Sequence, residues 1–373
     1  MSSPSEATEA TEATEATEAG DAVEQHENRS ADLKRFIAPG NISIVYLYAF
    51  GFILFTLWIP DLWLNWTTHK SVLNIQFAGQ ALVAVALVLP LLAGAFDLSI
   101  AGTMNATAIT SSWLVVNQEW SVGAAIAAAM VVAVIAGGFN ALLVVGVRIN
   151  SFIATLASGA ILTAYAEWRS GGILITGLPD SFKNLARQQL FWGIQLKVLY
   201  VFVIAAIIWY VVEHTPSGRY LQATGDNEPA ARLAGVRTNR YVILSLMTSA
   251  VIAGFAGIVQ TASINSGNAG VGNPFLLAAF AAAFLGSTQF KGRFNVWGTL
   301  AAVWVLLSGV KGIELAVRSF RWLNSLFFGV ALIVAVGFAS LLQRYREHRA
   351  ASQRTAEAHR VATAKSSATE GSS

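Results

Sequence analysis

The sequence predicts an all-α protein that crosses a membrane many times, and its composition and segmentation carry this prediction. Of the 373 residues, 55% are hydrophobic and only 12% are charged, whereas soluble domains carry about 25% charged residues. The apolar residues gather in long runs. A helix needs about 20 such residues to cross a bilayer, because each residue rises about 1.5 Å. The Lys and Arg residues lie mostly between these runs and near the ends of the chain, as expected of loops at a membrane surface.

The two ends of the chain differ from the rest. Residues 5–19 read SEATEATEATEATEA, a repeat that cannot bury enough apolar surface to offset the entropy lost on ordering. Residues 1–35 are therefore predicted to form a disordered acidic tail, and both a tail without function and a tail with a partner remain open. A secretory signal would begin with basic residues, so none is expected here. Residues 343–373 are predicted to be a basic and then polar cytoplasmic tail.

The transmembrane domain is predicted over residues 36–342, with about ten spans. The spans are expected near residues 42–60, 72–93, 97–116, 121–146, 151–168, 197–213, 241–262, 275–290, 294–312 and 320–342. Pro90 and Gly94 predict a kink or break late in the second span. Small residues at 136–138 and 253–257 predict close helix packing. The exact count stays open near residues 90–100 and 275–294.

The orientation follows from the charges of the loops. An even number of spans places both termini on one side of the membrane. The Lys and Arg residues near the spans are more numerous on that side, which the positive-inside rule assigns to the cytoplasm. The loop at 214–240 falls on the same side. Trp58, Trp63 and Trp66 are expected at the opposite interface.

One polar segment between the sixth and seventh spans has the signals of a short, capped helix. Asp226 or Asn227 can cap its start, Pro229 is tolerated in its first turn, and Gly235 suits a left-handed residue after its end. The helix is predicted over about 227–234, only two turns, so it must be held by packing. A docking element for a cytoplasmic partner and a loop helix resting on the membrane both fit this pattern.

The same segment resembles the coupling loop of ABC importer permeases, and more narrowly that of the ribose-type sugar permeases. The matching stretch consists of Gly225, Asp226, Asn227, Glu228, Ala230, Ala231, Arg232 and Gly235. Further similarities extend over about 70–342 and include the stretches 96–99, 151–156, 218–220 and 284–286. One motif departs from the family: residues 275–282 read FLLAAFAA, where familiar members carry carboxylates. The departure leaves the identity of the substrate open.

The resemblance implies the ABC importer permease fold and a subunit that moves a small polar solute, a sugar or polyol, across the bacterial inner membrane. Its implied partners are separate cytoplasmic ATP-binding subunits, an extracytoplasmic solute-binding protein, a second permease copy and the lipid bilayer. No cofactor is expected in this chain, since it has no Gly-x-x-x-x-Gly-Lys-Ser/Thr phosphate loop and the partner would bind ATP. No nucleic-acid partner is expected either, because the net charge is only +3.

Few polar residues lie within the predicted spans, and these are candidates for the substrate path because a charge in lipid costs at least about 2.5–3.5 kcal/mol. The candidates are Asp97, Ser99, Asn105, Asn140 and Gln260. Asp97 lies beside the predicted break, where a gate and a cap of the following helix are equally open. For the two Asn residues, hydrogen bonds between helices are the alternative.

Other function classes find less support in the sequence. A secondary transporter would carry coupling carboxylates near the membrane midplane, and only Asp97 is available for that role. No catalytic residues are assigned, because the sequence contains no nucleophile elbow or other catalytic constellation. No metal site is expected, because the five His residues are scattered and the chain has no Cys. The sequence therefore predicts a transporter subunit and not an enzyme.

Overall fold

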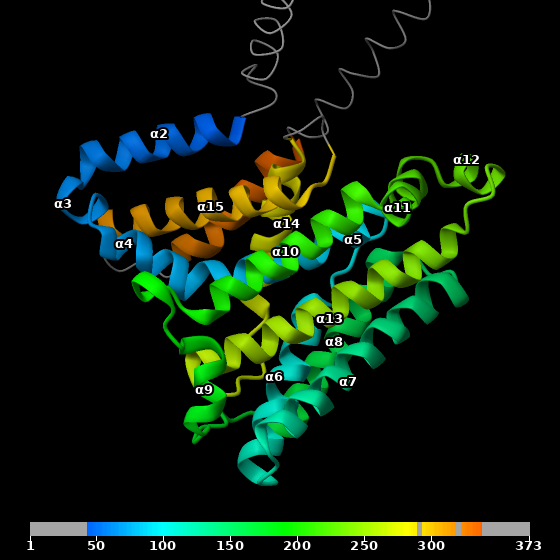
Figure 1. Cartoon of the computed structure of the whole chain (residues 1–373), viewed down its shortest axis with the longest axis horizontal. Helices are drawn as coiled ribbons and strands as arrows, with labels where there is room; N and C mark the ends of the chain where they lie inside the picture. Colours follow the sequence, from blue (N-terminus) through cyan, green and yellow to red (C-terminus); the bar gives the residue numbers. More distant parts are fainter. Residues whose placement is uncertain (1–42, 289–292, 318–321, 338–373) are drawn as a thin grey trace, which may run out of the picture.

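The computed structural model describes residues 43–288, 293–317 and 322–337, and all longer elements within them are helices (Figure 1). In chain order these are α2 (Ser43–Trp58), α3 (Pro60–Trp63), α4 (Trp66–Ser71), η1 (Val72–Phe77), α5 (Ala78–Leu92), α6 (Ile100–Asn117), α7 (Val122–Ala141), η2 (Leu142–Gly146), α8 (Ser151–Ser170), α9 (Asp180–Arg187), η3 (Phe191–Gly193), α10 (Leu196–His214), α11 (Pro216–Asp226), α12 (Glu228–Leu233), α13 (Thr238–Ile264), α14 (Asn273–Ser287) and α15 (Val296–Ala316). A further apolar helix covers Trp322–Gly337. The predicted tails at 1–35 and 343–373 lie outside the described residues.

Each predicted span coincides with a helix of the structure. Five helical stretches are long and apolar enough to cross a membrane: Trp66–Leu92, Val122–Gly146, Leu196–His214, Thr238–Ile264 and Val296–Ala316. Three shorter apolar helices are Ile44–Trp58, Asn273–Ser287 and Trp322–Gly337. The all-α, polytopic membrane class is thereby confirmed, whereas the number of ten spans stays a prediction.

The centre of the molecule is α5. Within the stretch Trp66–Leu92, 89% of the most apolar window is buried inside the protein, and every residue of α5 itself is buried. The helix packs against α13, α14, α15 and α10. A helix that is apolar on all sides belongs in such an interior position, and α5 reaches it because Ala, Val and Leu dominate its sequence.

Small residues bring neighbouring helices into backbone contact, as the sequence predicted. A Cβ atom on Gly137 of α7 would lie 2.8 Å from the Cα of Met247 on α13. A Cβ atom on Gly257 would lie 2.5 Å from the backbone oxygen of Met104 on α6. Larger side chains would force these helices apart, so α13 sits between α6 and α7 through its small residues.

The predicted break after the second span is confirmed. Pro90 remains inside α5, which continues to Leu92. The chain then turns at Gly94, whose φ of +74° is a left-handed conformation that suits glycine. Residues 93–99 form no helix, and α6 begins at Ile100. The proline thus marks the end of the helix and does not kink it earlier.

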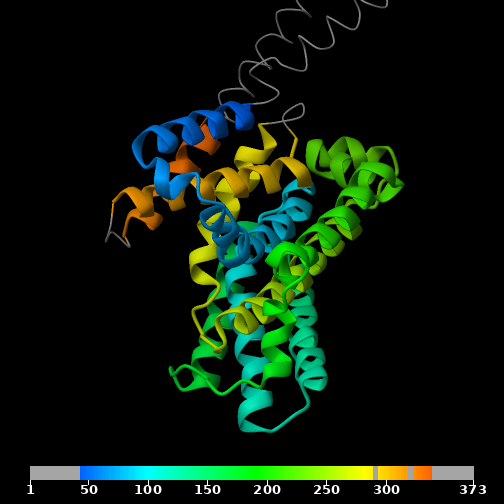
Figure 2. The same cartoon turned by 60° about the vertical axis from the view of Figure 1, so that its left-hand side comes forward.

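Several short helices outside the predicted spans were absent from the sequence prediction, and two of them matter for the site. One is α11, which precedes the predicted coupling helix, and the other is α9, in the loop between α8 and α10. Phe182 and Ala186 of α9 are fully buried, where this helix packs on α13 and α10. On its exposed side, the hydrogen bond that Lys183 donates to Asp180 lowers the pKa of that carboxyl group. In Figures 1 and 2, α9 and α12 lie at opposite ends of the bundle.

Candidate functional site

The polar segment that the sequence singled out projects from one end of the bundle as two successive helices, α11 and α12 (green, upper right in Figure 2). Asn227 separates them in an extended conformation, and its side-chain oxygen accepts a hydrogen bond of 3.0 Å from the backbone N–H of Ala230. It therefore caps α12, whereas Asp226 ends α11. Pro229 lies in the first turn of α12, where its missing N–H costs nothing.

The end of α12 also follows the prediction. Gly235 has a φ of +85°, and its N–H donates to the carbonyl of Arg232 at 3.0 Å. The next N–H, that of Val236, donates to Ala231 at 2.9 Å. These bonds satisfy carbonyls that the helix end would otherwise leave open. The predicted two-turn helix is therefore confirmed together with both of its end signals.

Polar contacts fasten α12 to the first turn of α13. An oxygen of Glu228 lies 2.6 Å from a guanidinium nitrogen of Arg232. The same guanidinium group donates to Thr238 at 2.8 Å and to Asn239 at 2.9 Å, and Thr238 donates to Glu228 at 3.2 Å. Arg232 thus serves to hold the helix in place. The outward surface of α12 is instead apolar at Leu233, which is 92% exposed.

The predicted coupling segment, which consists of α11 and α12, touches the break between α5 and α6. A Cβ atom on Gly225 would lie 2.1 Å from the carbonyl oxygen of Leu92 and 2.9 Å from the backbone nitrogen of Gly94. Only a residue without a side chain allows this approach. Arg293 supports the segment from the other side, donating to Gln222 at 3.2 Å and lying 3.5 Å from Asp226. Through Gly225, α11 is thus in direct backbone contact with the end of α5.

Three of the predicted path residues lie together in a buried network at this break. One oxygen of Asp97 accepts hydrogen bonds from the backbone N–H of Ser99 at 3.0 Å and from its hydroxyl at 2.6 Å. The Ser99 hydroxyl accepts from Asn140 of α7 at 2.7 Å, and Ser158 of α8 donates to Asn140. All four side chains are essentially inaccessible. The geometry favours capping and helix–helix bonding for these residues over a place in an open path.

Two of the stretches that carry the family resemblance meet at the same break. The hydroxyl of Ser151 accepts from the N–H of Phe96 at 3.1 Å, and that of Thr155 accepts from Leu98 at 3.0 Å. Thr155 also donates to the carbonyl of Phe96 at 3.2 Å. The start of α8 thereby satisfies backbone groups that the interrupted helix leaves open. Distant motifs of the sequence thus form one structural unit.

Asn105 has a comparable structural role in the middle of the bundle. Its side-chain nitrogen donates to Asn273 at 2.9 Å and to Thr163 at 3.1 Å, while its oxygen accepts from the N–H of Gly272 at 2.7 Å. The residue is fully buried. It therefore ties α6 to α8 and to the start of α14.

Gln260, one of the five candidates, lines a cavity formed by described residues. The cavity has a volume of about 400 Å³. Its polar wall consists of Gln76, Gln80, Gln260, Asn273, Asn324 and Ser325, and its apolar wall consists of Ile75, Pro274, Phe275, Leu277, Leu307, Val310 and Phe328. Gln80 donates to the carbonyl of Phe275 at 3.2 Å. The side-chain oxygen of Gln76 is buried and has no hydrogen-bond partner among the described residues. The cavity therefore offers neutral amides and aromatic rings, and none of the described residues that line it is charged.

Comparison with known proteins decides the family. The model of the family described as "Branched-chain amino acid transport system / permease component" matches residues 72–336. The chain belongs to this family. The ribose import permease protein of Escherichia coli (strain K12) is 29% identical over 252 residues, which cover 65% of this chain and 77% of that protein. The autoinducer 2 import system permease protein of Enterobacter sp. (strain 638) is 31% identical over 275 residues, which cover 72% and 78%. No solved structure matches this chain.

The family match extends over all elements from η1 to the helix at 322–337, and so includes the coupling segment, the break and the polar cavity. The protein is therefore a multi-pass membrane permease, a transporter subunit of an ABC import system. The match leaves out α2, α3 and α4, which precede residue 72. Of these helices, α2 and α3 pack on α15, and α4 packs on α3 and η1.

The cavity residues other than Gln260 were missed from the sequence, although one signal was present. Gln76 and Gln80 are four residues apart in an otherwise apolar run, a spacing that puts both amides on one face of a helix. Neutral amides in a span are unusual enough to mark such a face. Asn273 and Asn324 carry no comparable signal, because each lies at the start of a helix, where polar residues are common.

Proposed function

We propose that this chain imports a small neutral polar solute, a sugar or a polyol, across the bacterial inner membrane, driven by separate ATP-binding subunits. The observation that carries the proposal is the contact between the coupling segment and the break after α5, at Gly225, Leu92 and Gly94. The names of the relatives, import permeases for ribose and for autoinducer 2, support the solute class.

The coupling segment offers the partner subunit a small but well-held surface. The cap by Asn227 and the contacts of Arg232 fix α12 on the membrane domain, so a push on α12 moves α11 as well. Leu233 presents an apolar anchor outside the protein core, of the kind that binding pockets take up. Closure of two ATP-binding subunits would press on two such segments, one in each of two permease copies.

A force exerted on α12 by the ATP-binding subunit would be transmitted through α11 to the membrane-spanning helices. Gly225 lies against Leu92 and Gly94, and residues 96–99 follow within the hydrogen-bonded network of α7 and α8. A packed network of this kind moves as a unit, because its bonds cannot be exchanged for bonds to water within the membrane. The shift would therefore tilt α5 against α6, and α5 forms one wall of the polar cavity through Gln80.

The chemistry of the cavity supports a neutral solute. Amides donate and accept hydrogen bonds, which suits hydroxyl groups, and the rings of Phe275 and Phe328 suit the apolar face of a sugar. The buried, unpaired oxygen of Gln76 is an acceptor that a hydroxyl group would satisfy. The family description favours a branched-chain amino acid as a second candidate. A zwitterion would need charged partners in a buried site, and the described part of the chain places no charged side chain in the wall of this cavity.

The remaining partners follow from the same proposal. The loop 214–240 and both termini would lie in the cytoplasm, as the loop charges predict. The end of the bundle that holds α9 would then face a solute-binding protein outside. A secondary transporter remains the alternative class, and the coupling segment distinguishes the two because such a carrier has no use for an ATPase-docking helix.

The proposal is tested by reconstituting the permease with its ATP-binding subunits and its solute-binding protein in liposomes. Sugars, polyols and branched-chain amino acids are then compared for stimulation of ATP hydrolysis and for uptake. Stimulation by a sugar or polyol and none by amino acids is the expected result. Stimulation by amino acids alone would assign the second candidate, and uptake without ATP would assign a secondary transporter.

A further inference from the structure

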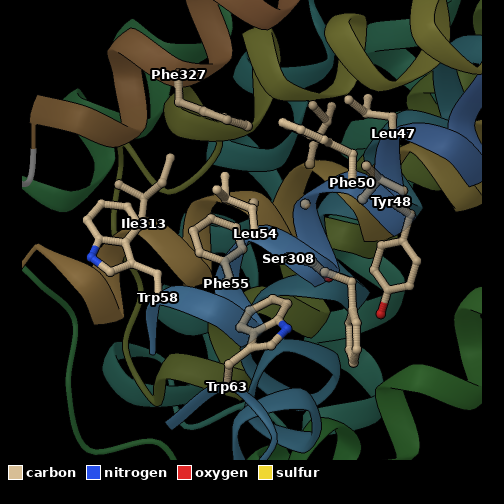
Figure 3. A pocket seen from close by; sticks show the side chains of 15 residues that line it. Leu47, Tyr48, Phe50, Leu54, Phe55, Trp58, Trp63, Ser308, Ile313 and Phe327 are labelled. Atoms are coloured by element: carbon tan, nitrogen blue, oxygen red, sulfur yellow. The ribbon is translucent and has the colours of Figure 1, made fainter. Parts of the chain in front are cut away.

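A second cavity, separate from the polar one, lies at the side of the bundle. It has a volume of about 370 Å³ and is bounded by α2, α3, α15 and the helix at 322–337. Figure 3 shows that aromatic and aliphatic side chains form most of its wall, among them Phe55, Trp58, Trp63 and Phe327. The lining residues of α2 that face outward, such as Phe50 at 66% exposed, place this cavity on the lipid-facing side of the protein.

Among the polar side-chain atoms of the lining residues, two are buried and have no hydrogen-bond partner in the part of the chain that the structure describes. These atoms are the indole nitrogen of Trp63 and the hydroxyl oxygen of Ser308, and no described residue forms a hydrogen bond with either. Both residues are buried, with exposed fractions of 1% for Trp63 and 3% for Ser308. Both residues line the cavity, and both are labelled in Figure 3. A buried polar group without a partner costs about 1–3 kcal/mol. A ligand that brings an acceptor into the cavity would remove this cost.

Charged residues close to these atoms in the sequence indicate how deep the atoms lie in the membrane. Lys311 of α15 lies 3.7 Å from Glu314, and charged side chains of a membrane helix belong at the interface. Ser308 precedes Lys311 by three residues, which is about 4.5 Å along the helix axis. Trp63 follows the exposed Asp61 by two residues. The unpaired atoms thus lie just inside the edge of the hydrocarbon, at the level where the ester groups of lipids are found.

We propose that this cavity binds one acyl chain of a glycerolipid from the leaflet opposite α12, with its ester carbonyl accepting hydrogen bonds from Trp63 and Ser308. The apolar wall takes up the chain, and the two donors take up the carbonyl. A free fatty acid fits less well, because none of the described residues that line the cavity is a cation that could pair with its carboxylate. The lipid would fasten α2 and α3, which precede the family domain, to α15.

The test uses the full-length protein in liposomes of phosphatidylethanolamine and phosphatidylglycerol that contain a trace of phospholipid with a diazirine in one acyl chain. Labelled peptides are located by mass spectrometry after irradiation. Gly51 lines the cavity, and a Cβ atom added to it meets nothing within 4 Å, so Gly51→Leu is the variant chosen to occupy the space. Gly138 of α7 is equally open and lies outside the cavity, so Gly138→Leu is the matched control.

In the parent protein, label is expected on the peptides of α2 and α15. In Gly51→Leu this labelling should fall at least about fivefold, the loss of affinity expected when one or two CH₂ groups of the acyl chain are no longer buried. It should be unchanged in Gly138→Leu. Label on these peptides that is insensitive to Gly51→Leu would overturn the proposal. The chain has no Cys, so Gly51→Cys adds a single thiol. Efficient disulfide formation between two copies at this position would show that a second copy fills the cavity, and would also overturn it.

The carbonyl contact has its own test. An ester lipid should compete with the photoactivatable lipid about two- to tenfold better than an ether lipid with the same chains, as for one or two net hydrogen bonds. Trp63→Phe should remove this preference, whereas Trp192→Phe, at an 86% exposed position outside the cavity, should keep it. Equal competition by ester and ether lipids in the parent protein would refute the assignment of the carbonyl to Trp63 and Ser308.

Discussion

Gly235→Val perturbs the coupling segment through backbone conformation alone. A Cβ atom at Gly235 would meet nothing within 4 Å, but the φ of +85° is disfavoured for any residue with a side chain. The left-handed conformation costs about 1–2 kcal/mol for an ordinary residue, and a β-branched one is a still rarer occupant. The variant therefore destabilises the end of α12 without disturbing a packed surface.

The size of this penalty can be compared with what holds α12. The Asn227 cap contributes about 1 kcal/mol. The Glu228–Arg232 pair is about half exposed, and an exposed pair at this spacing contributes about 0.3–0.5 kcal/mol. The penalty is therefore of the same size as the local stabilisation, so the population of the docked helix should fall about 5- to 30-fold. The membrane helices lie elsewhere and should remain folded.

The assay is uptake and solute-stimulated ATP hydrolysis in liposomes, with the amount of permease in the membrane as reference. Gly171→Val is the matched control, since Gly171 also ends a helix with positive φ and open space, at the other end of α8 from the break. Gly235→Val should lose most uptake and ATPase association at normal abundance, and Gly171→Val should lose neither. Equal loss in both variants, or full uptake by Gly235→Val, would refute the reasoning.

Three further variants test other parts of the account. In Gly225→Val, the Cβ atom alone would lie 2.1 Å from the carbonyl oxygen of Leu92. We therefore expect at least about 2 kcal/mol of local destabilisation and a lower ratio of uptake to ATP hydrolysis. An unchanged ratio would contradict the role of this contact in coupling. Asp97→Asn keeps a side-chain oxygen that can accept both hydrogen bonds from Ser99. Uptake by this variant is therefore expected within about twofold of the parent. A complete loss of uptake would instead support Asp97 as a charge-dependent gate. Gln260→Leu removes an amide from the polar cavity. The solute concentration for half-maximal uptake should then rise about 5- to 30-fold, the effect of losing one or two hydrogen bonds to the solute, while protein abundance stays normal. An unchanged concentration would exclude the cavity from the solute path.

Elements with strong local signals could be predicted from the sequence. The apolar runs predicted the helices of the bundle, because a membrane span needs a length and a composition that few other elements share. Asn227, Pro229 and Gly235 predicted the ends of α12, because caps depend on individual residues at fixed positions. Gly94 and Pro90 predicted the break for the same reason. In each case the structure depends on neighbours along the chain.

Features that depend on packing could not be predicted in this way. The sequence treats Asp97, Ser99 and Asn140 as separate polar residues, and only the approach of α7 and α8 to the break joins them. Gln260 becomes part of a cavity because α5, α13 and α15 meet around it. The short helix α9 has too few residues for a periodic pattern, and its burial through Phe182 depends on α13. Whether the path residues carry solute stays a prediction.

Cross-linking from α12 tests the central claim most directly. The chain has no Cys and Leu233 is 92% exposed, so Leu233→Cys allows one photoreactive maleimide to be attached to the outer surface of α12. In the assembled importer this probe should cross-link to the ATP-binding subunit, and the yield should change when ATP is added. The same probe at Trp192→Cys, at the other end of the bundle, should give no such product. A probe at Leu233 that never reaches the ATP-binding subunit, in a complex that still transports, would contradict the assignment of α12 as the coupling helix.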